Sequence, residues 1–375
     1  MSGNFLNNML GLKPKLDYRY SIKDALIALS SLFNKETDLT SLSGIFGNNN
    51  IFFVNHARTG LRIALNSLGL KKGSRIGVQA FNCFTVFNAI RNAGYCPVFI
   101  DINDAFQIDL NDVERKKNEI DALIVSHLFG IPSDMQSLKD ILHDIPIIED
   151  CAHAFLSKYD GLPLGTIGDI GVFSMGKGKF PSIGSGGFII SKFEYIKMIE
   201  TELSKLNNNS LFDEIISVLT SLMLSSLHHP YIYKVFTQPY LKKLDRKSDF
   251  LGKFKSDERR ILSSNKYLFL KKMINIKNIL KYRIDKGENL VRRFDGSQTL
   301  SDTITNPLYS LNYFMLPVLL PSDKESLIIQ FRREGIEVAP HFKNSIVWAE
   351  SFGYEIGNCP NSEKIANEIL VIPTY

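Results

Sequence analysis

Short apolar runs alternate with helical patterns between residues 50 and 191, and this alternation limits the folds that the chain can adopt. The runs RIGVQAF, CPVFIDI, DALIVSHLFG and IPIIED predict strands, whereas TVFNAIRNAG and MQSLKDILHD predict the helices between them. Strands that are connected through helices by short turns form a mostly parallel sheet, and the helices cover both of its faces. We therefore expect an α/β fold.

The pattern changes after residue 191, and this change indicates the domain organisation. We predict an N-terminal arm with one apolar helix at residues 1–50, and a large domain at 51–260 with a helical insertion at about 195–255. Residues 261–375 predict a connecting helix and a small C-terminal α+β domain, with YFMLPVLL and GIEVAPHF as strands. A chain of 375 residues is long enough for one large and one smaller domain.

The composition argues against several classes of protein. Hydrophobic residues make up 44%, charged residues 22%, and the net charge is only +5, without a basic stripe that would indicate nucleic-acid binding. The start, MSGNFLNNMLGLKPK, lacks the apolar segment of a signal peptide. The cysteines form no CxxC pair, which argues against a disulfide framework or a zinc site; they are Cys83, Cys96, Cys151 and Cys359. We expect a cytoplasmic protein.

One uncharged stretch, at residues 215–233, raises the question of a membrane. It reads IISVLTSLMLSSLHHPYIY from its first isoleucine, and its length approaches that of a membrane span. Several serines and a His-His-Pro sequence interrupt it. The pattern therefore favours a buried or interface helix and no transmembrane segment, with attachment to a bilayer surface as the alternative.

The residues with the clearest chemistry lie between positions 145 and 191. One strand ends in Asp150, a second ends at Ser174, and Lys179 follows on a glycine-rich turn before a third strand. Side chains at the ends of neighbouring strands can converge on one point. A carboxylate, a hydroxyl and a lysine together suit pyridoxal 5'-phosphate, which needs a partner for its ring nitrogen, a phosphate ligand and a covalent amine.

Each of these residues also has a purely structural interpretation. Asp150 can be a polar strand end, and His153 can lie over the cofactor ring, hold its oxygen, or be a structural histidine. Lys177 is the rival of Lys179, and both can belong to a solvated basic turn. Ahead of them, Arg58 and Thr59 open a helix whose N-terminus can bind an anion, although most such sequences only cap helices.

At this point the chain resembles a known family, the DegT/DnrJ/EryC1/StrS sugar aminotransferases, which are fold type I, aspartate-aminotransferase-like enzymes. The resemblance covers most of residues 50–191 and returns at 315–375. Its motifs are ARTGLRIAL at 57–65, AFNCFTVFNAI at 80–90, HLFGIPSDM at 127–135, EDCAHAF at 149–155, GDIGVFSMGKGKFPSIGSGG at 168–187 and CPNSEKIANEILVIPTY at 359–375.

The resemblance implies a role for individual residues of the cofactor site. Lys179 would be the Schiff-base lysine, Asp150 the partner of the pyridinium nitrogen, His153 a residue beside the ring, and Ser174 a phosphate ligand. Arg58 and Thr59 fall near the family's phosphate-binding turn, where HARTG departs from the usual sequence.

Further positions follow from the same resemblance. An aromatic residue usually stacks on the ring, and Phe81 is favoured over Phe84 for this place. His341 lies where the small domain of the family approaches the substrate, although a surface histidine is the alternative. The helical segment at about 195–255 lacks the asparagine motif with which the family reaches the partner subunit's phosphate.

The function that the resemblance implies is transfer of an amino group from L-glutamate to a nucleotide-linked keto-sugar, for a surface polysaccharide or a glycoside. A homodimer with sites at the subunit interface is expected. Alternatives are transamination of a non-sugar ketone such as a cyclitol, sugar dehydration, and a non-catalytic binding or regulatory protein with the same fold. Dehydratase relatives usually carry histidine in place of the Schiff-base lysine, so Lys179 argues against that activity.

Overall fold

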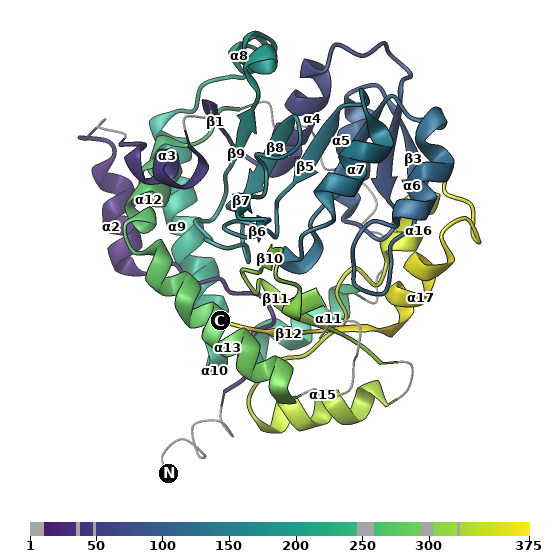
Figure 1. The fold of residues 1–375 in the computed structure, drawn as a ribbon. Coiled ribbons are helices and arrows are strands. Elements are labelled where there is room, and N and C mark those ends of the chain that lie inside the picture. Colours follow the sequence, from purple (N-terminus) through teal and green to yellow (C-terminus); the bar gives the residue numbers. More distant parts are fainter. Residues whose placement is uncertain (1–10, 35–37, 48–49, 246–258, 294–302, 321–322) are drawn as a thin grey trace.

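The computed structural model describes residues 11–34, 38–47, 50–245, 259–293, 303–320 and 323–375. It confirms the predicted α/β architecture with a seven-stranded sheet in the order β1-β9-β8-β5-β4-β2-β3 (Figure 1). All neighbouring pairs except those of β9 are parallel, and β9 runs antiparallel to both β1 and β8. The strands are β1 (Asn50–Val54), β2 (Arg75–Gln79), β3 (Cys96–Ile100), β4 (Ala122–Ser126), β5 (Ile147–Asp150), β8 (Ile170–Ser174) and β9 (Gly187–Ser191).

Helices flank this sheet, as the sequence pattern predicted (Figure 1). Gly60 lets one of them approach closely, because a Cβ atom at this position would lie 2.9 Å from Cγ1 of Val172 in β8. The close approach brings the N-terminus of that helix to the strand ends. The helices of this region are α4 (Ala57–Ser67), α5 (Phe84–Asn92), α6 (Leu110–Lys116), α7 (Met135–Leu142) and α8 (Ile196–Ser204).

The register of β8 and β9 places aromatic side chains together in the core. Phe173 of β8 lies opposite Phe188 of β9, and their rings stack with centroids 4.4 Å apart. Phe46 packs against both rings, at 5.2 Å and 5.8 Å. Burial of large aromatic side chains stabilises the fold strongly and fixes β8, which ends at Ser174, against β9.

The N-terminal arm differs in detail from the prediction. Among the described residues of the arm there are two helices, α2 (Ile22–Ser30) and α3 (Thr40–Phe46), where the sequence predicted one. Ser21 and Asp24 form a capping box that starts α2. Ahead of it, the backbone N–H of Lys13 donates to the carbonyl of Gly335 at 2.8 Å, so that the arm contacts the C-terminal part of the chain.

The predicted helical insertion is helical as far as residue 245, and its remaining part lies outside the described residues. Over the part of the chain that is described, no single helix is both long and apolar enough to cross a membrane. Two consecutive helical segments, Leu211–Leu227 and Pro230–Lys243, reach that length and apolarity only when they are taken together, and the chain bends by 65° between them. The helices are α9 (Leu211–Leu227), α10 (Pro230–Ile232), a π-helix at Tyr233–Thr237, and α11 (Gln238–Asp245).

In the C-terminal part the connecting helix consists of two helices, α12 (Ser263–Met273) and α13 (Ile276–Arg293). The prediction of a strand at GIEVAPHF was wrong, because this segment forms only isolated bridges at Ile336 and Ala339. Pro340, which has no N–H, interrupts any ladder there.

The domain boundaries at 50 and 260 stay a prediction. The remaining elements are β6 (Lys158–Tyr159), β7 (Leu162–Pro163), β10 (Tyr309–Ser310), β11 (Met315–Leu319), β12 (Ile369–Pro373), α15 (Lys324–Arg333), α16 (Ser345–Glu350) and α17 (Pro360–Glu368).

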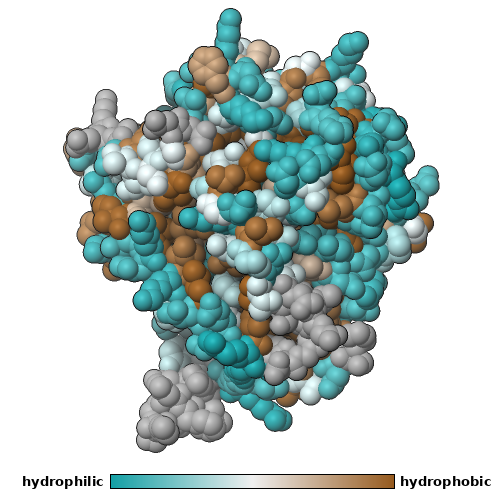
Figure 2. Space-filling model, in the orientation of Figure 1, coloured by the Kyte–Doolittle hydropathy of each residue, from teal (hydrophilic) through white to brown (hydrophobic). Residues whose placement is uncertain are grey.

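The outer surface seen from the side of Figure 1 is mainly hydrophilic. Figure 2 shows apolar residues there as small groups between polar and charged ones. Scattered apolar side chains of this kind are normal on protein surfaces and indicate no site by themselves.

Candidate active site

The carboxyl ends of β4, β5 and β8 and the N-terminus of α4 surround a cavity of about 490 Å³. This volume is in the range of small-molecule sites in proteins. The structure brings five of the predicted residues together in its wall: Arg58, Asp150, His153, Ser174 and Lys179. Strand ends and a helix N-terminus thus converge as the sequence pattern predicted.

Asp150 presents a buried carboxylate to this cavity and is only 6% exposed. Ser126 donates its hydroxyl to Oδ2 at 3.2 Å, and the backbone N–H of Ala152 donates to Oδ1 at 3.0 Å. Burial raises the pKa of Asp150, while the hydrogen bond from Ala152 and the charge of Lys179 oppose this shift. A carboxylate oxygen accepts more than one hydrogen bond, so Asp150 retains capacity for a cationic N–H group in the cavity.

Lys179 lies on the turn between β8 and β9. Burial lowers the pKa of its ammonium group, against attraction from Cys83 and Asp150. Its Nζ lies 5.5 Å from the ring centroid of Phe314. Lys177 also lines the cavity but is exposed. The more enclosed Lys179 is therefore the better source of an uncharged, nucleophilic amine.

His153 is held between two aromatic rings. It stacks on Phe314 at 4.4 Å and on Phe342 at 5.7 Å, with interplanar angles of 19° and 11°. The backbone N–H of Phe129 donates to its Nδ1 at 3.3 Å, which assigns the hydrogen to Nε2. Burial, together with Lys179 and His341, holds the pKa of His153 well below its usual value, so the ring is neutral.

His341 adjoins this stack but is not part of the cavity wall. Its ring lies 5.8 Å from that of His153 and 4.2 Å from that of Phe342. Its Nε2 has no hydrogen-bond partner among the described residues, and burial lowers its pKa well below the usual value. His341 therefore places a buried nitrogen without a partner next to Phe342, which lines the cavity.

The N-terminus of α4 provides the means to bind an anion. His56, Ala57 and Arg58 line the cavity, and the N–H groups of the first helical turn have no acceptor within the helix. Ser174 lines the same cavity, and its Oγ accepts from the N–H of Gly176 at 3.4 Å. Thr59 is buried in the same turn, 5% exposed, and lies outside the wall.

The predicted aromatic residue is placed elsewhere. Phe81 is fully buried and packs against Phe129 and Phe342, and neither Phe81 nor Phe84 lines the cavity. Cys83 and neighbouring polar side chains form the wall at this point. The residues of the wall that sequence reasoning missed include Asn82, Cys83, Thr85, Ser126, Ser185 and Phe342. The position of Ser126 at the end of β4, next to β5, is a signal that could have identified it.

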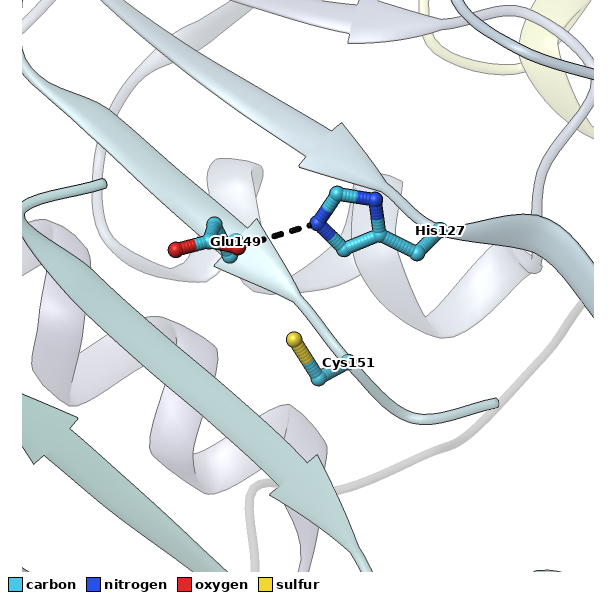
Figure 3. Close-up of side chains that lie close together, drawn as sticks. All are labelled: His127, Glu149 and Cys151. Atoms are coloured by element: carbon cyan, nitrogen blue, oxygen red, sulfur yellow. Dashed lines mark hydrogen bonds and ion pairs between the residues drawn. The ribbon is translucent and has the colours of Figure 1, made fainter. Parts of the chain in front are cut away.

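Glu149, His127 and Cys151 form a second polar cluster at the ends of β4 and β5, and His127 also lines the cavity (Figure 3). Glu149 accepts from His127 Nε2 at 3.1 Å and from the N–H groups of Gly165, Ile167 and Gly168 at 2.6–2.8 Å. His127 Nδ1 accepts from the N–H of Ser133 at 3.1 Å. Both ring nitrogens are therefore engaged, and burial keeps the Cys151 thiol protonated by raising its pKa. The hydrogen bonds of Glu149 and His127 make this cluster a structural support of the strand end.

The cavity fits pyridoxal phosphate in its charged and hydrogen-bonding groups. A buried carboxylate with spare acceptor capacity suits the ring nitrogen, the enclosed Lys179 suits the aldehyde, and the N-terminus of α4 suits the phosphate. Together with the mixed seven-stranded sheet, these features define the class of fold type I pyridoxal-phosphate enzymes.

Comparison with known proteins identifies the family. The sequence profile of the DegT/DnrJ/EryC1/StrS aminotransferase family matches residues 40–210 and 260–375, and the chain belongs to this family, whose members use pyridoxal phosphate. The sugar aminotransferase CalS13 from Micromonospora echinospora has the same fold, with a TM-score of 0.72 at 18% identity, covering 97% of this chain and 95% of that one.

Two curated relatives match over shorter segments. GDP-perosamine synthase from Escherichia coli is 35% identical over 142 residues, 37% of this chain and 39% of the relative. L-glutamine:scyllo-inosose aminotransferase from Streptomyces griseus is 33% identical over 135 residues, 35% of this chain and 32% of the relative. In both cases the match spans about two-fifths or less of the relative's length.

Proposed function

We propose that this protein is a pyridoxal-phosphate-dependent aminotransferase that transfers an amino group from L-glutamate to a nucleotide-linked keto-sugar. The observation that carries the proposal is the convergence of Asp150 and Lys179 on one cavity at the N-terminus of α4. The product would be used for a surface polysaccharide or a glycoside, in the cytoplasm, by a homodimer.

Pyridoxal phosphate supplies an electron sink when it is bound. Asp150 would hold the proton on the ring nitrogen, and Arg58, Ser174 and the first turn of α4 would hold the phosphate. Neutral His153, fixed between Phe314 and Phe342, would orient the ring from one side. Lys179 Nζ, whose pKa is lowered by burial, would take the proton from the α-carbon of the amino donor and return it later.

The names of the relatives support this substrate class and one alternative. One acts on a GDP-linked sugar by its name, and another on scyllo-inosose, which is a cyclitol. Transamination of a cyclitol is therefore the second candidate. Incubation of the purified protein with pyridoxal phosphate, L-glutamate and a panel of nucleotide keto-sugars and cyclitol ketones separates the two, because each aminated product has a characteristic mass.

The same preparation tests whether the fold is catalytic at all. Enzyme purified with pyridoxal phosphate should show the visible absorbance band of the lysine-bound cofactor, and L-glutamate should shift it. A protein that shows no band after addition of the cofactor would be a non-catalytic relative, and the proposed function would be wrong.

Replacement of Asp150 by asparagine should lower the turnover number by about 100-fold or more, because an amide cannot stabilise the protonated ring nitrogen. The N–H of Ala152, which donates to Oδ1, can still donate to the asparagine oxygen, and the Ser126 hydroxyl, which donates to Oδ2, can instead accept from the asparagine NH₂ group, so the protein should remain folded. Steady-state kinetics and the absorbance of the bound cofactor measure both effects. Lys177→Ala serves as a matched control at the cavity, and equal activity of Asp150→Asn and wild type would exclude Asp150 from this role.

A further inference from the structure

A row of buried polar side chains leads to the carboxylate of Asp150, and the proposed function has not used it. Its members are Asn82, Ser126 and Asp150, which are 2%, 3% and 6% exposed and all line the cavity. Nδ2 of Asn82 donates to Oγ of Ser126 at 2.9 Å, and Oγ of Ser126 donates to Oδ2 of Asp150 at 3.2 Å. Because little water screens buried groups, neighbours in such a row influence each other strongly.

The direction of these hydrogen bonds is fixed at Asn82. Its Oδ1 accepts from the backbone N–H of Cys83 at 2.7 Å. An N–H group can only donate, so the amide oxygen lies on this side and the NH₂ group faces Ser126. The Ser126 hydroxyl has a single hydrogen, and among the described residues Asp150 is its only acceptor. The hydroxyl is therefore directed at Asp150 as a donor.

Gln79 holds the backbone of Ser126 in place. The ladder between β2 and β4 ends at the pair of Val78 and Ile124. Beyond it, the fully buried side chain of Gln79 continues the contact: its Nε2 donates to the carbonyl of Ser126 at 2.8 Å, and its Oε1 accepts from the N–H of Ser126 at 2.7 Å. Two hydrogen bonds to one residue restrict its movement, so the hydroxyl is preorganised before a ligand enters.

The two oxygens of Asp150 each receive one hydrogen from the protein. The backbone N–H of Ala152 serves Oδ1, and the Ser126 hydroxyl serves Oδ2. Burial raises the pKa of Asp150, whereas these two donors and the charge of Lys179 oppose the shift. Hydrogen bonds to the charged form of an acid favour that form over the neutral one. Without the Ser126 donor, burial would drive Asp150 further toward the protonated acid.

We propose that Asn82 and Ser126 are positioning residues for Asp150, and that they keep its carboxylate ionised so that it can hold a protonated ring nitrogen in the cavity. Neither side chain needs to touch the reacting atoms, because both act through Asp150. This role rests on the proposed function, since it is the cationic ring nitrogen of pyridoxal phosphate that needs an ionised partner at this place.

The acidity of Asp150 in the cofactor-free protein tests this role. Nuclear magnetic resonance follows the titration of aspartate carboxyl groups labelled with carbon-13, and Asp150→Asn identifies the signal. Ser126→Ala should raise the pKa of Asp150 by about 1, because a donor to the charged form is lost. Asn82→Ala should raise it by less, because the hydroxyl remains but is no longer directed. The double variant should titrate like Ser126→Ala alone, because Asn82 acts only through that hydroxyl.

Ser67→Ala is the matched control. The Ser67 hydroxyl is also 3% exposed, but it donates to the carbonyl of Ile63 in α4 at 2.8 Å, so its loss should leave the titration of Asp150 unchanged. Circular dichroism shows whether each variant is folded, and Asn82→Ala keeps the test valid if Ser126→Ala is not. An unchanged pKa of Asp150 in the folded variants overturns the proposal. Effects that add up in the double variant overturn the directing role of Asn82.

This titration needs neither cofactor nor substrate, so the role of Asn82 and Ser126 and the proposed function can fail separately. A shifted pKa in a protein that shows no absorbance band with pyridoxal phosphate contradicts the proposed function alone. An unchanged pKa beside a normal band and normal transamination contradicts only the role of the two residues. In the loaded enzyme, Ser126→Ala should lower the turnover number about ten-fold near neutral pH, and the loss should shrink as the pH rises because Asp150 ionises again.

Discussion

Replacement of Lys179 by alanine is expected to reduce turnover by about 10⁴-fold or more, since both the covalent amine and the proton-transfer group are lost. The absorbance band of lysine-bound cofactor should disappear with it. After borohydride reduction, mass spectrometry of wild type should find the cofactor on the peptide that contains residue 179, and none in the variant. Pyridoxal phosphate can still be held non-covalently through the N-terminus of α4.

Lys177→Ala is the control that shows which of the two lysines binds the cofactor covalently. Both lysines line the cavity, but Lys177 is exposed, whereas Lys179 faces Asp150 and the ring of Phe314. Lys177→Ala should keep the band and most of the activity. If Lys177→Ala were inactive and Lys179→Ala active, the assignment of the covalent lysine would be reversed. In the cofactor-free protein, Lys179→Ala should be no less stable than wild type, because burial of the ammonium group is unfavourable.

Glu149→Gln is expected to have the largest effect on folding, lowering the free energy of unfolding by about 3 kcal/mol or more at neutral pH. The carboxylate is fully buried and accepts from three backbone N–H groups and from His127. A glutamine keeps one acceptor oxygen and turns an NH₂ group toward these donors, which leaves buried groups unsatisfied. Urea unfolding followed by circular dichroism measures the difference.

The pH dependence of this difference provides a second readout. His127 and the backbone hydrogen bonds hold the pKa of Glu149 below its ordinary value of 4.5, although burial opposes them. The stabilisation is therefore fully present above about pH 4.5 and is lost as the pH falls through the folded-state pKa. Wild type and variant should converge in acid. Glu355→Gln, at an exposed position, should change stability little at any pH. A Glu149→Gln variant as stable as wild type would show that the network is dispensable.

Much of the fold follows from local sequence patterns. The strands that end at Asp150 and Ser174, and the glycine-rich turn that carries Lys179, were predictable because apolar periodicity and turn residues mark element ends locally. The rule that neighbouring parallel strands present their carboxyl ends together then placed these residues in one site. The predicted strand at GIEVAPHF failed because its bridges are made to Lys13 and Val371, which are distant in the sequence.

The tertiary structure decided which side chains face the cavity. Phe81 and Cys83 lie two residues apart, and no local pattern distinguishes them; packing against Phe129 and Phe342 takes Phe81 into the core and leaves Cys83 in the wall. The distance between His153 and His341 was equally beyond local reasoning, since it depends on how the C-terminal part packs on the sheet.

The sequence by itself determined the order of the elements, the strand-end chemistry and the family. Only the tertiary structure decided the orientation of side chains within those elements, including the Ser126 hydroxyl that faces Asp150. The physical reason is that periodicity shows which residues share a face of a helix or strand, whereas long-range contacts, such as those of Gln79 with Ser126, decide where that face is turned.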